Sequence, residues 1–131
     1  MRLRVSNLVL DASALLALLH REPGSEVVEE AIPGAAMSAV NLSEVAAKLA
    51  DGGMPETVVI ETLSNIEMDV HPFDSTAAFQ AGMLRPLTRD LGLSFGDRAC
   101  LALGLQLGLP VLTADRHWSD LDLSVEVRQI R

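Results

Sequence analysis

Residues 93–104 read LSFGDRACLALG, and this stretch places a carboxylate where a fold rarely needs one. Ser94 is typical of a helix N-cap, and Asp97 follows one turn later in a helix composed largely of Ala, Leu, Gly and Cys. An anion in the first turn of such a helix lies at the positive end of the helix dipole, beside buried surface. Asp97 is therefore either a cap or part of a functional site. The stretches 8–13, 41–45 and 112–116 decide between the two interpretations.

The composition predicts one folded domain spanning residues 1–131. A chain of 131 residues with 49% hydrophobic residues is long enough and apolar enough to bury a core. Aromatic residues make up only 3%, so aliphatic side chains must fill that core. The single Cys100 excludes an internal disulfide, and a buried, reduced thiol indicates a cytoplasmic protein.

The N-terminal region resembles a secretory signal only superficially. Arg2 and Arg4 precede an apolar run over 8–19, but Asp11 interrupts that run and no clean cleavage pattern follows it. No stretch reaches the roughly 18 uninterrupted apolar residues that a membrane span needs. We therefore expect a cytoplasmic protein that does not contact a membrane.

The formal net charge of −8 is unusual for a nucleic-acid-binding protein, because phosphate binding normally leaves a basic surface. A bound cation would cancel part of this charge. Several of the bases also lie near the acidic stretches in the sequence, namely Arg85, Arg89, Arg98 and Arg116. Taken alone, the charge favours a protein or metal partner over broad electrostatic binding of RNA.

Short apolar runs alternate along the chain with patterns typical of helices. Strands are expected at 8–10, 36–40, 68–71, 110–113 and 125–130, and helices at 12–20, 25–31, 41–50, 55–65, 75–84 and 95–107, with a loop at 87–92 and a helical turn at 115–118. This alternation predicts an α/β fold in which helices cover both faces of a mostly parallel sheet of about five strands.

Four acids are expected at one edge of this sheet. Asp11 and Asp115 directly follow apolar strands, and Glu44 and Asp97 lie near the starts of helices that follow a strand or loop. In open parallel sheets, functional sites form beyond the carboxyl ends of the strands.

Each acid also has a structural explanation when it is taken singly. Asn41 with Glu44, and Ser94 with Asp97, have the spacing of a capping box, while Asp11 and Asp115 suit the N-cap position. Together, however, close carboxylates repel each other by about 4 kcal/mol per pair at an effective dielectric near 20. A divalent cation removes this conflict, and Mg²⁺ or Mn²⁺ suits oxygen ligands. With no second Cys and no His pair at ligand spacing, the sequence argues against a structural zinc site.

The ordered set LVLDAS (8–13), NLSEV (41–45), FGD (95–97) and LTAD (112–115) resembles the PIN-domain ribonucleases. It is most similar to the VapC toxins of toxin–antitoxin pairs, and the resemblance covers nearly the whole chain. It implies a three-layer α/β/α fold. It also implies that the family's acidic quartet is matched by Asp11, Glu44, Asp97 and Asp115. Two hydroxyl positions that the family places near the metal are matched by Ser13 and Thr113.

The implied activity is metal-assisted hydrolysis of RNA phosphodiester bonds by a toxin, with Mg²⁺ or Mn²⁺ as cofactor. Asp11 and Asp97 are the first choices as metal ligands. Asp115 is a further ligand, and Glu44 completes the shell or orders the water. The Thr113 hydroxyl is expected to orient Asp115 or a water molecule.

Arg98 and Arg116 each follow a quartet acid, so they are candidates for contact with RNA phosphates. A solvated surface position or an ion pair explains them equally well. His117 is interpreted as a surface residue, Trp118 as a plug that packs the short turn on the sheet, and Asp120 as part of an ordinary polar turn.

The resemblance further implies a cognate antitoxin protein, an RNA substrate and a homodimer. The segments 12–31 and 54–65 offer apolar surface for the protein contacts, although core packing explains the same residues. Two alternatives stay open: a catalytically silent PIN-fold module that binds RNA or protein, and an Mg²⁺-dependent phosphotransfer domain. The second has little support. Ser13 stands where dehalogenases need a second Asp, and the only lysine, Lys48, does not lie late in the chain as in receiver domains.

Overall fold

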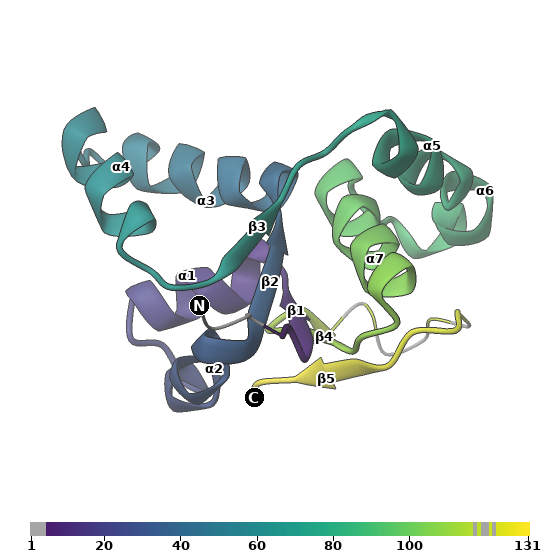
Figure 1. Ribbon diagram of the computed structural model, residues 1–131, viewed down its shortest axis with the longest axis horizontal. Helices are drawn as coiled ribbons and strands as arrows, with labels where there is room; N and C mark the ends of the chain where they lie inside the picture. Colours follow the sequence, from purple (N-terminus) through teal and green to yellow (C-terminus); the bar gives the residue numbers. More distant parts are fainter. Residues whose placement is uncertain (1–4, 117, 119–120, 122) are drawn as a thin grey trace.

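The computed structural model describes residues 5–116, 118, 121 and 123–131. These residues form a five-stranded sheet of order β3-β2-β1-β4-β5, in which every neighbouring pair is parallel (Figure 1). The strands are β1 Leu8–Leu10, β2 Ala35–Ser38, β3 Asp69–His71, β4 Val111–Thr113 and β5 Val127–Gln129. The predicted fold class is confirmed, and β1, the first strand, lies at the centre of the sheet.

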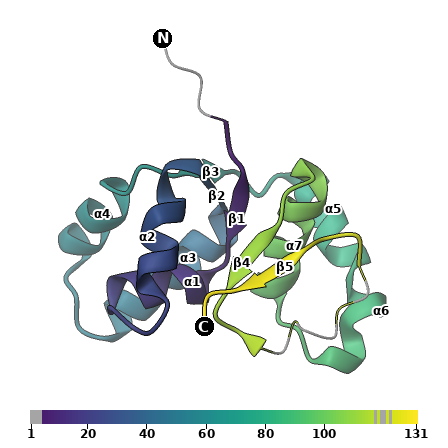
Figure 2. The ribbon, with the colours of Figure 1, turned by 90° about the horizontal axis from the view of Figure 1, so that it is seen from below.

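Alternation along the strands separates two cores, one on each face of the sheet. Leu10 and Leu112 pack with the helices α1 to α4, whereas Val9 and Val111 pack with α5 and α7. The two helical layers lie on opposite sides of the sheet (Figure 2). The helices are α1 Ala12–Leu19, α2 Ser25–Ala31, α3 Ala39–Asp51, α4 Glu56–Ser64, α5 Ser75–Met83, α6 Arg85–Thr88 and α7 Phe95–Leu107, with 3-10 turns η1 Ile32–Gly34 and η2 Arg89–Leu91.

Helix α3 begins two residues earlier than the sequence predicts. Ser38 is the N-cap, since its hydroxyl accepts a hydrogen bond from the Val40 amide at 3.2 Å. The expected strand over 36–40 therefore ends at Ser38, and the expected cap at Asn41 is wrong. Asn41 lies inside the helix and is buried.

The expected loop at 87–92 is largely helical. Pro86 lies in the first turn of α6, where its missing N–H leaves no hydrogen bond unmade. The buried Thr88 hydroxyl donates to the Leu84 carbonyl at 2.9 Å, and η2 follows directly. Helix propensity did not predict this helical segment, because the segment is short and is held by tertiary contacts.

Two further expectations concern single residues. Trp118 is buried in the core shared with α7, as expected of a plug, and Cys100 is a buried free thiol. His117 and Asp120 lie outside the described residues. Within the described part of the chain, no helix combines the length and apolar character needed to cross a bilayer.

Candidate active site

The carboxyl ends of β1 and β4 and the N-terminal halves of α3 and α7 enclose a cavity of about 210 Å³. All four predicted acids line it: Asp11, Glu44, Asp97 and Asp115. The other lining residues are Ala12, Ser13, Leu16, Asn41 and Lys48. Residues more than 100 positions apart in the sequence thus share one small space, as the parallel topology predicts.

Asp11 follows β1 and is the N-cap of α1. Its Oδ1 accepts a hydrogen bond from the Ala14 amide at 2.8 Å, and the Ser13 hydroxyl donates to both carboxylate oxygens at 2.8 and 2.9 Å. The Thr113 hydroxyl donates to Oδ2 from the neighbouring strand. The side chain is 4% exposed, so its orientation is fixed on several sides.

Burial raises the pKa of Asp11 from 3.8 to about 6. Hydrogen bonds from Thr113, Ala14 and Ser13 lower it, and the negative charge of Asp97 raises it further. Desolvation is the largest of these effects, so the ionised carboxylate is costly in this position. A nearby cation would relieve that cost.

The two predicted hydroxyls connect the ends of β1 and β4. Ser13 and Thr113 lie 3.2 Å apart between their oxygens, and each accepts a backbone hydrogen bond at 2.9 Å, from Ala114 and Asp115 respectively. Thr113 therefore contacts Asp11 through its proton and the backbone of Asp115 through its oxygen. The Asp115 carbonyl in turn accepts a hydrogen bond from the Gln129 side chain on β5 at 2.9 Å.

Asp97 is both a cap and a member of the site. Its Oδ2 accepts from the Ser94 amide at 2.9 Å and its amide donates to the Ser94 hydroxyl at 3.2 Å, which completes the predicted capping box. The same carboxylate lines the cavity and raises the pKa of Asp11. The two interpretations of this residue are thus compatible.

Glu44 reaches the cavity from the second turn of α3. Its Oε1 accepts a hydrogen bond from the Asn41 amide group at 2.8 Å, and the same amide group donates to the Gly96 carbonyl of α7 at 3.0 Å. A Cβ atom at position 96 would overlap the Glu44 carboxylate, so a side chain there would force the Glu44 side chain to move.

Sequence reasoning missed Asn41 and Lys48 as site residues. With Glu44 they occupy positions i, i+3 and i+7 of α3, which is one helix face. That spacing was a usable signal, but it was obscured when the helix was expected to start at Asn41. Lys48 is the only lysine of the chain and its exposed side chain lines the acidic cavity.

Neither predicted arginine is among the residues that line this cavity in the described structure. Arg98 donates to the Ala81 carbonyl of α5 at 3.2 Å and lies 5.9 Å from the centre of the Phe95 ring. Arg116 is exposed and donates to the Arg131 carbonyl at 3.1 Å. Contact of either side chain with RNA phosphates stays a prediction.

The donor chemistry of the cavity fits a hard divalent cation held by few protein ligands. Over the described residues, no three His, Cys, Asp or Glu side chains form a group that could hold a metal ion. Mg²⁺ does not need such a group, since it commonly uses one or two carboxylates together with waters and substrate phosphates. The buried Oδ1 of Asn41, which has no hydrogen-bond partner among the described residues, adds an oxygen to this polar set.

The fold is a parallel α/β sheet with acids gathered beyond its central strands. A comparison of the sequence with family models identifies the family that shares this arrangement. The PIN domain model matches residues 8–123. The chain belongs to the PIN domain family. No curated protein matches the chain.

Solved structures share the fold over nearly their whole length. The DNA-bound VapBC of Salmonella typhimurium has a TM-score of 0.75 at 15% identity, covering 97% of this chain and 100% of that chain. A toxin–antitoxin complex from Klebsiella pneumoniae has a TM-score of 0.73 at 18% identity, covering 95% and 98%. VapC20 of Mycobacterium tuberculosis, described as a sarcin-ricin loop cleaving toxin, has a TM-score of 0.72 at 15% identity, covering 92% and 99%.

Proposed function

We propose that this chain is an Mg²⁺- or Mn²⁺-dependent endoribonuclease and the toxin of a toxin–antitoxin pair. The observation that supports this most is the shared cavity of Asp11, Glu44, Asp97 and Asp115. Membership of the PIN domain family adds support. So does the fold shared with a toxin described as cleaving the sarcin-ricin loop.

Asp11 and Asp97, with Asp115 as a further ligand, would hold the cation. When bound, it would neutralise charge on the scissile phosphate and lower the pKa of a water molecule. Ser13 and Thr113 fix the Asp11 carboxylate, so little reorganisation is needed on binding. Glu44 completes the shell around the cation or orders the attacking water. The Lys48 ammonium at the cavity offsets the charge of the incoming phosphate.

The deciding test is RNA cleavage by the purified chain with Mg²⁺ or Mn²⁺, with and without chelator, beside the variants Asp97→Asn and Asp74→Asn. Asp74 is the control because it is also an aspartate at a helix start that accepts a backbone hydrogen bond, as the N-cap of α5 from the Ala77 amide at 2.9 Å, and it does not line the cavity. We expect chelator and Asp97→Asn to abolish cleavage and Asp74→Asn to retain it. Equal cleavage by all three proteins indicates a contaminant, and no cleavage by any favours the silent binding module.

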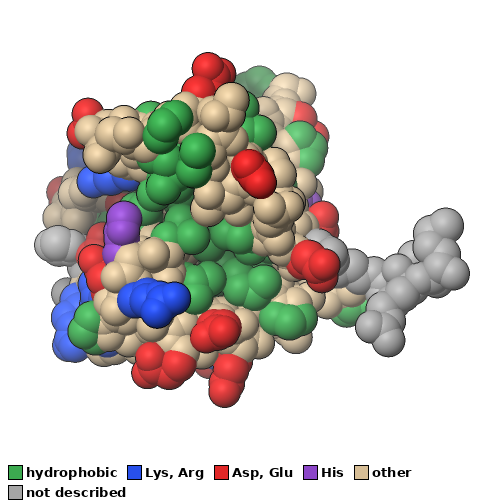
Figure 3. All heavy atoms as spheres, turned by 90° about the vertical axis from the view of Figure 1, so that its left-hand side faces the viewer, with side chains coloured by type: hydrophobic (Ala, Val, Ile, Leu, Met, Phe, Trp, Pro, Cys, Tyr) green, Lys and Arg blue, Asp and Glu red, His purple; other side chains and the backbone are tan. Residues whose placement is uncertain are grey.

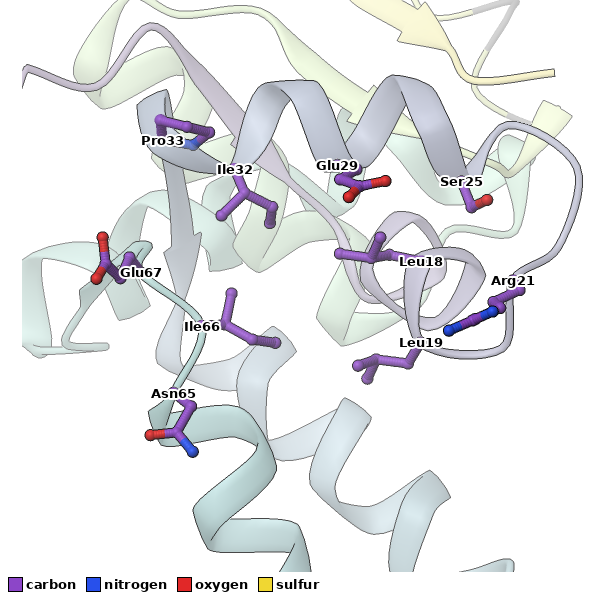
Figure 4. A pocket seen from close by; sticks show the side chains of 10 residues that line it. All are labelled: Leu18, Leu19, Arg21, Ser25, Glu29, Ile32, Pro33, Asn65, Ile66 and Glu67. Carbon is purple, nitrogen blue, oxygen red and sulfur yellow. The ribbon is translucent and has the colours of Figure 1, made fainter.

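We also propose an antitoxin as a partner, docking between two segments that the sequence singles out for protein contacts. A cavity of about 910 Å³ lies between α1, α2 and the segment after α4 (Figure 4). Leu18, Leu19, Ile32 and Ile66 form its apolar part, and the polar side chains around it include Glu29 and Glu67. On this face hydrophobic side chains gather around a hollow with acidic side chains nearby (Figure 3). The fold neighbours include toxin–antitoxin complexes, which supports this partner.

For the homodimer we propose a different surface, on α5 and α6. Phe79, Met83 and Leu87 follow one another at spacings of four and are 73%, 68% and 66% exposed. Phe79 and Met83 line an open groove of about 430 Å³ with Leu105 of α7. A two-fold axis would pair α5 with its copy in antiparallel orientation, which brings Asp74 at one end of the helix near Arg85 of the other copy.

A further inference from the structure

Asn41 is the most buried polar side chain of the cavity, with 1% of its surface exposed. It lies in the first turn of α3, one helical turn before Glu44. Its Nδ2 group donates to two acceptors on different helices, Glu44 Oε1 at 2.8 Å and the Gly96 carbonyl at 3.0 Å. One amide group therefore ties a site carboxylate to the first turn of α7.

The orientation of this amide is fixed by its neighbours. Both contacts are acceptors, so a flipped amide would place Oδ1 against two oxygens. In the observed orientation Oδ1 is buried and has no hydrogen-bond partner within the described structure. An unsatisfied buried acceptor destabilises a fold, and a leucine of similar volume would avoid that cost. Packing therefore does not explain an asparagine at this position, whereas the two hydrogen bonds that its Nδ2 group donates do.

The surroundings of Glu44 suggest what the amide does instead. The carboxylate packs over Gly96, in the space a side chain would fill, and it lines the cavity. The hydrogen bond from Asn41 restrains the end of this long side chain. A freely rotating glutamate loses entropy when it takes part in a bound complex.

We propose that Asn41 is a positioning residue that holds Glu44 and the start of α7 in the arrangement that binds a divalent cation. The inference rests on the proposed function, because it concerns the same cavity. It predicts that Asn41→Leu lowers the affinity for Mg²⁺ and Mn²⁺ by about 10- to 100-fold, as the loss of a group that orients a ligand commonly does. The global fold stays intact in this variant.

The experiment measures cation binding by the full chain without RNA. Mg²⁺ is titrated by calorimetry into wild type, Asn41→Leu and Thr88→Val. Thr88 is the matched control, because it is an equally buried polar residue that donates one hydrogen bond, to the carbonyl of Leu84 just before α6, and does not line the cavity. Thermal unfolding of each metal-free variant shows whether a loss of affinity is separate from a loss of stability.

A second readout does not need Asn41→Leu, so it can be measured even if that variant fails to fold. The chain has three asparagines and three glutamines, which makes the side-chain amide signals in a nitrogen–proton NMR spectrum easy to assign. We expect the Asn41 amide pair to exchange slowly with solvent and to shift when Mg²⁺ is added. Glu44→Gln should remove the Mg²⁺-dependent shift.

The outcomes separate the two proposals. Weaker Mg²⁺ binding in Asn41→Leu alone, with a Mg²⁺-sensitive amide pair, supports the positioning role. The positioning role is wrong if Asn41→Leu binds Mg²⁺ as wild type does, or if the Asn41 amide signals do not shift when Mg²⁺ is added. In either case the nuclease proposal stands. If wild type binds neither Mg²⁺ nor Mn²⁺, the proposed function fails and the inference fails with it.

Discussion

Asp11 shows how a single residue can be both structural and chemical. It caps α1 through the Ala14 amide, a role that Asn or Ser fills without a charge. Burial nevertheless removes it from solvent and raises its pKa to about 6. The fold therefore bears the cost of an ionised carboxylate at neutral pH, and a bound cation gives a physical reason for that cost.

This pKa predicts how stability depends on pH in the metal-free protein. Between pH 3.8 and 6 the native state retains a proton that the unfolded chain has released, so stability falls as pH rises. Above pH 6 the loss is complete. A shift of about 2 units corresponds to about 3 kcal/mol. Asp11→Asn should raise the free energy of unfolding at pH 7.5 by about 1–3 kcal/mol and flatten the wild-type decline.

Urea denaturation of both proteins from pH 4.5 to 8 checks this prediction. Subtracting the Asp11→Asn curve from the wild-type curve removes the titration of the other groups. A difference that does not vary across this range would contradict the raised pKa of Asp11. In the same series, Mg²⁺ should bind wild type less tightly below pH 6, because the proton and the cation compete for the carboxylate.

Gly96 gives a second prediction at the scale of one residue. Gly96→Ala places a methyl group where the Glu44 carboxylate lies, so the flexible Glu44 side chain must move. This should weaken cation binding and offset the gain in helix propensity, so that stability changes by less than about 1 kcal/mol. Gly82→Ala in α5 is the control, since no atom lies within 4 Å of the added methyl group. It should stabilise the protein by up to about 1 kcal/mol through helix propensity. Thermal unfolding of the two variants measures the contrast, and equal shifts would argue against close packing at Gly96.

At the scale of the element, α7 begins with a capping box that also serves the site. Ser94→Ala removes the hydroxyl that accepts the Asp97 amide, so it should lower the free energy of unfolding by about 1 kcal/mol. The Asp97 carboxylate keeps its contact with the Ser94 amide. Cation affinity should therefore fall far less than in Asp97→Asn. Denaturant unfolding and calorimetry on the same samples measure both quantities, and a loss of affinity as large as that of Asp97→Asn would show that the cap itself sets the site.

At the scale of the whole molecule, the exposed apolar stripe on α5 predicts self-association. The double variant Phe79→Ser with Met83→Ser should shift the chain from dimer to monomer at micromolar concentration, because it removes two exposed apolar side chains. Ile60→Ser, at an exposed apolar position on α4, is the control and should leave the dimer intact. Sedimentation velocity measures the change. If the wild type sediments as a monomer, the proposed dimer surface on α5 and α6 is wrong.

The net charge of −8 also acquires a meaning at this scale. Part of it is concentrated where four acids line one cavity, next to the only lysine. The proposed cation would offset these charges, and in that case the acidic total does not argue against phosphate binding at that cavity. The sequence alone could count the acids but could not show that they share a space.

Much of the architecture followed from local patterns. Short apolar runs and capped helices predicted the parallel α/β sheet, and the position of Asp11 and Asp115 just after strands predicted their common edge. The capping box of Ser94 and Asp97 was likewise readable, because it needs only residues three apart. These features depend on interactions between residues that are close in the sequence, so they can be predicted from it.

Other features depended on contacts between distant segments. Asn41 became a buried link between α3 and α7 because Ser38 starts the helix and Gly96 leaves room for Glu44. Arg98 turned toward the Ala81 carbonyl, and Arg116 toward the C-terminal residue. Hydrogen-bond partners 15 to 55 positions away decided these orientations. The sequence by itself determined the order of strands and helices and the acids at their ends, such as Asp11 and Asp97, whereas only the tertiary structure decided which side chains meet, because burial and long-range hydrogen bonds exist only in the folded chain.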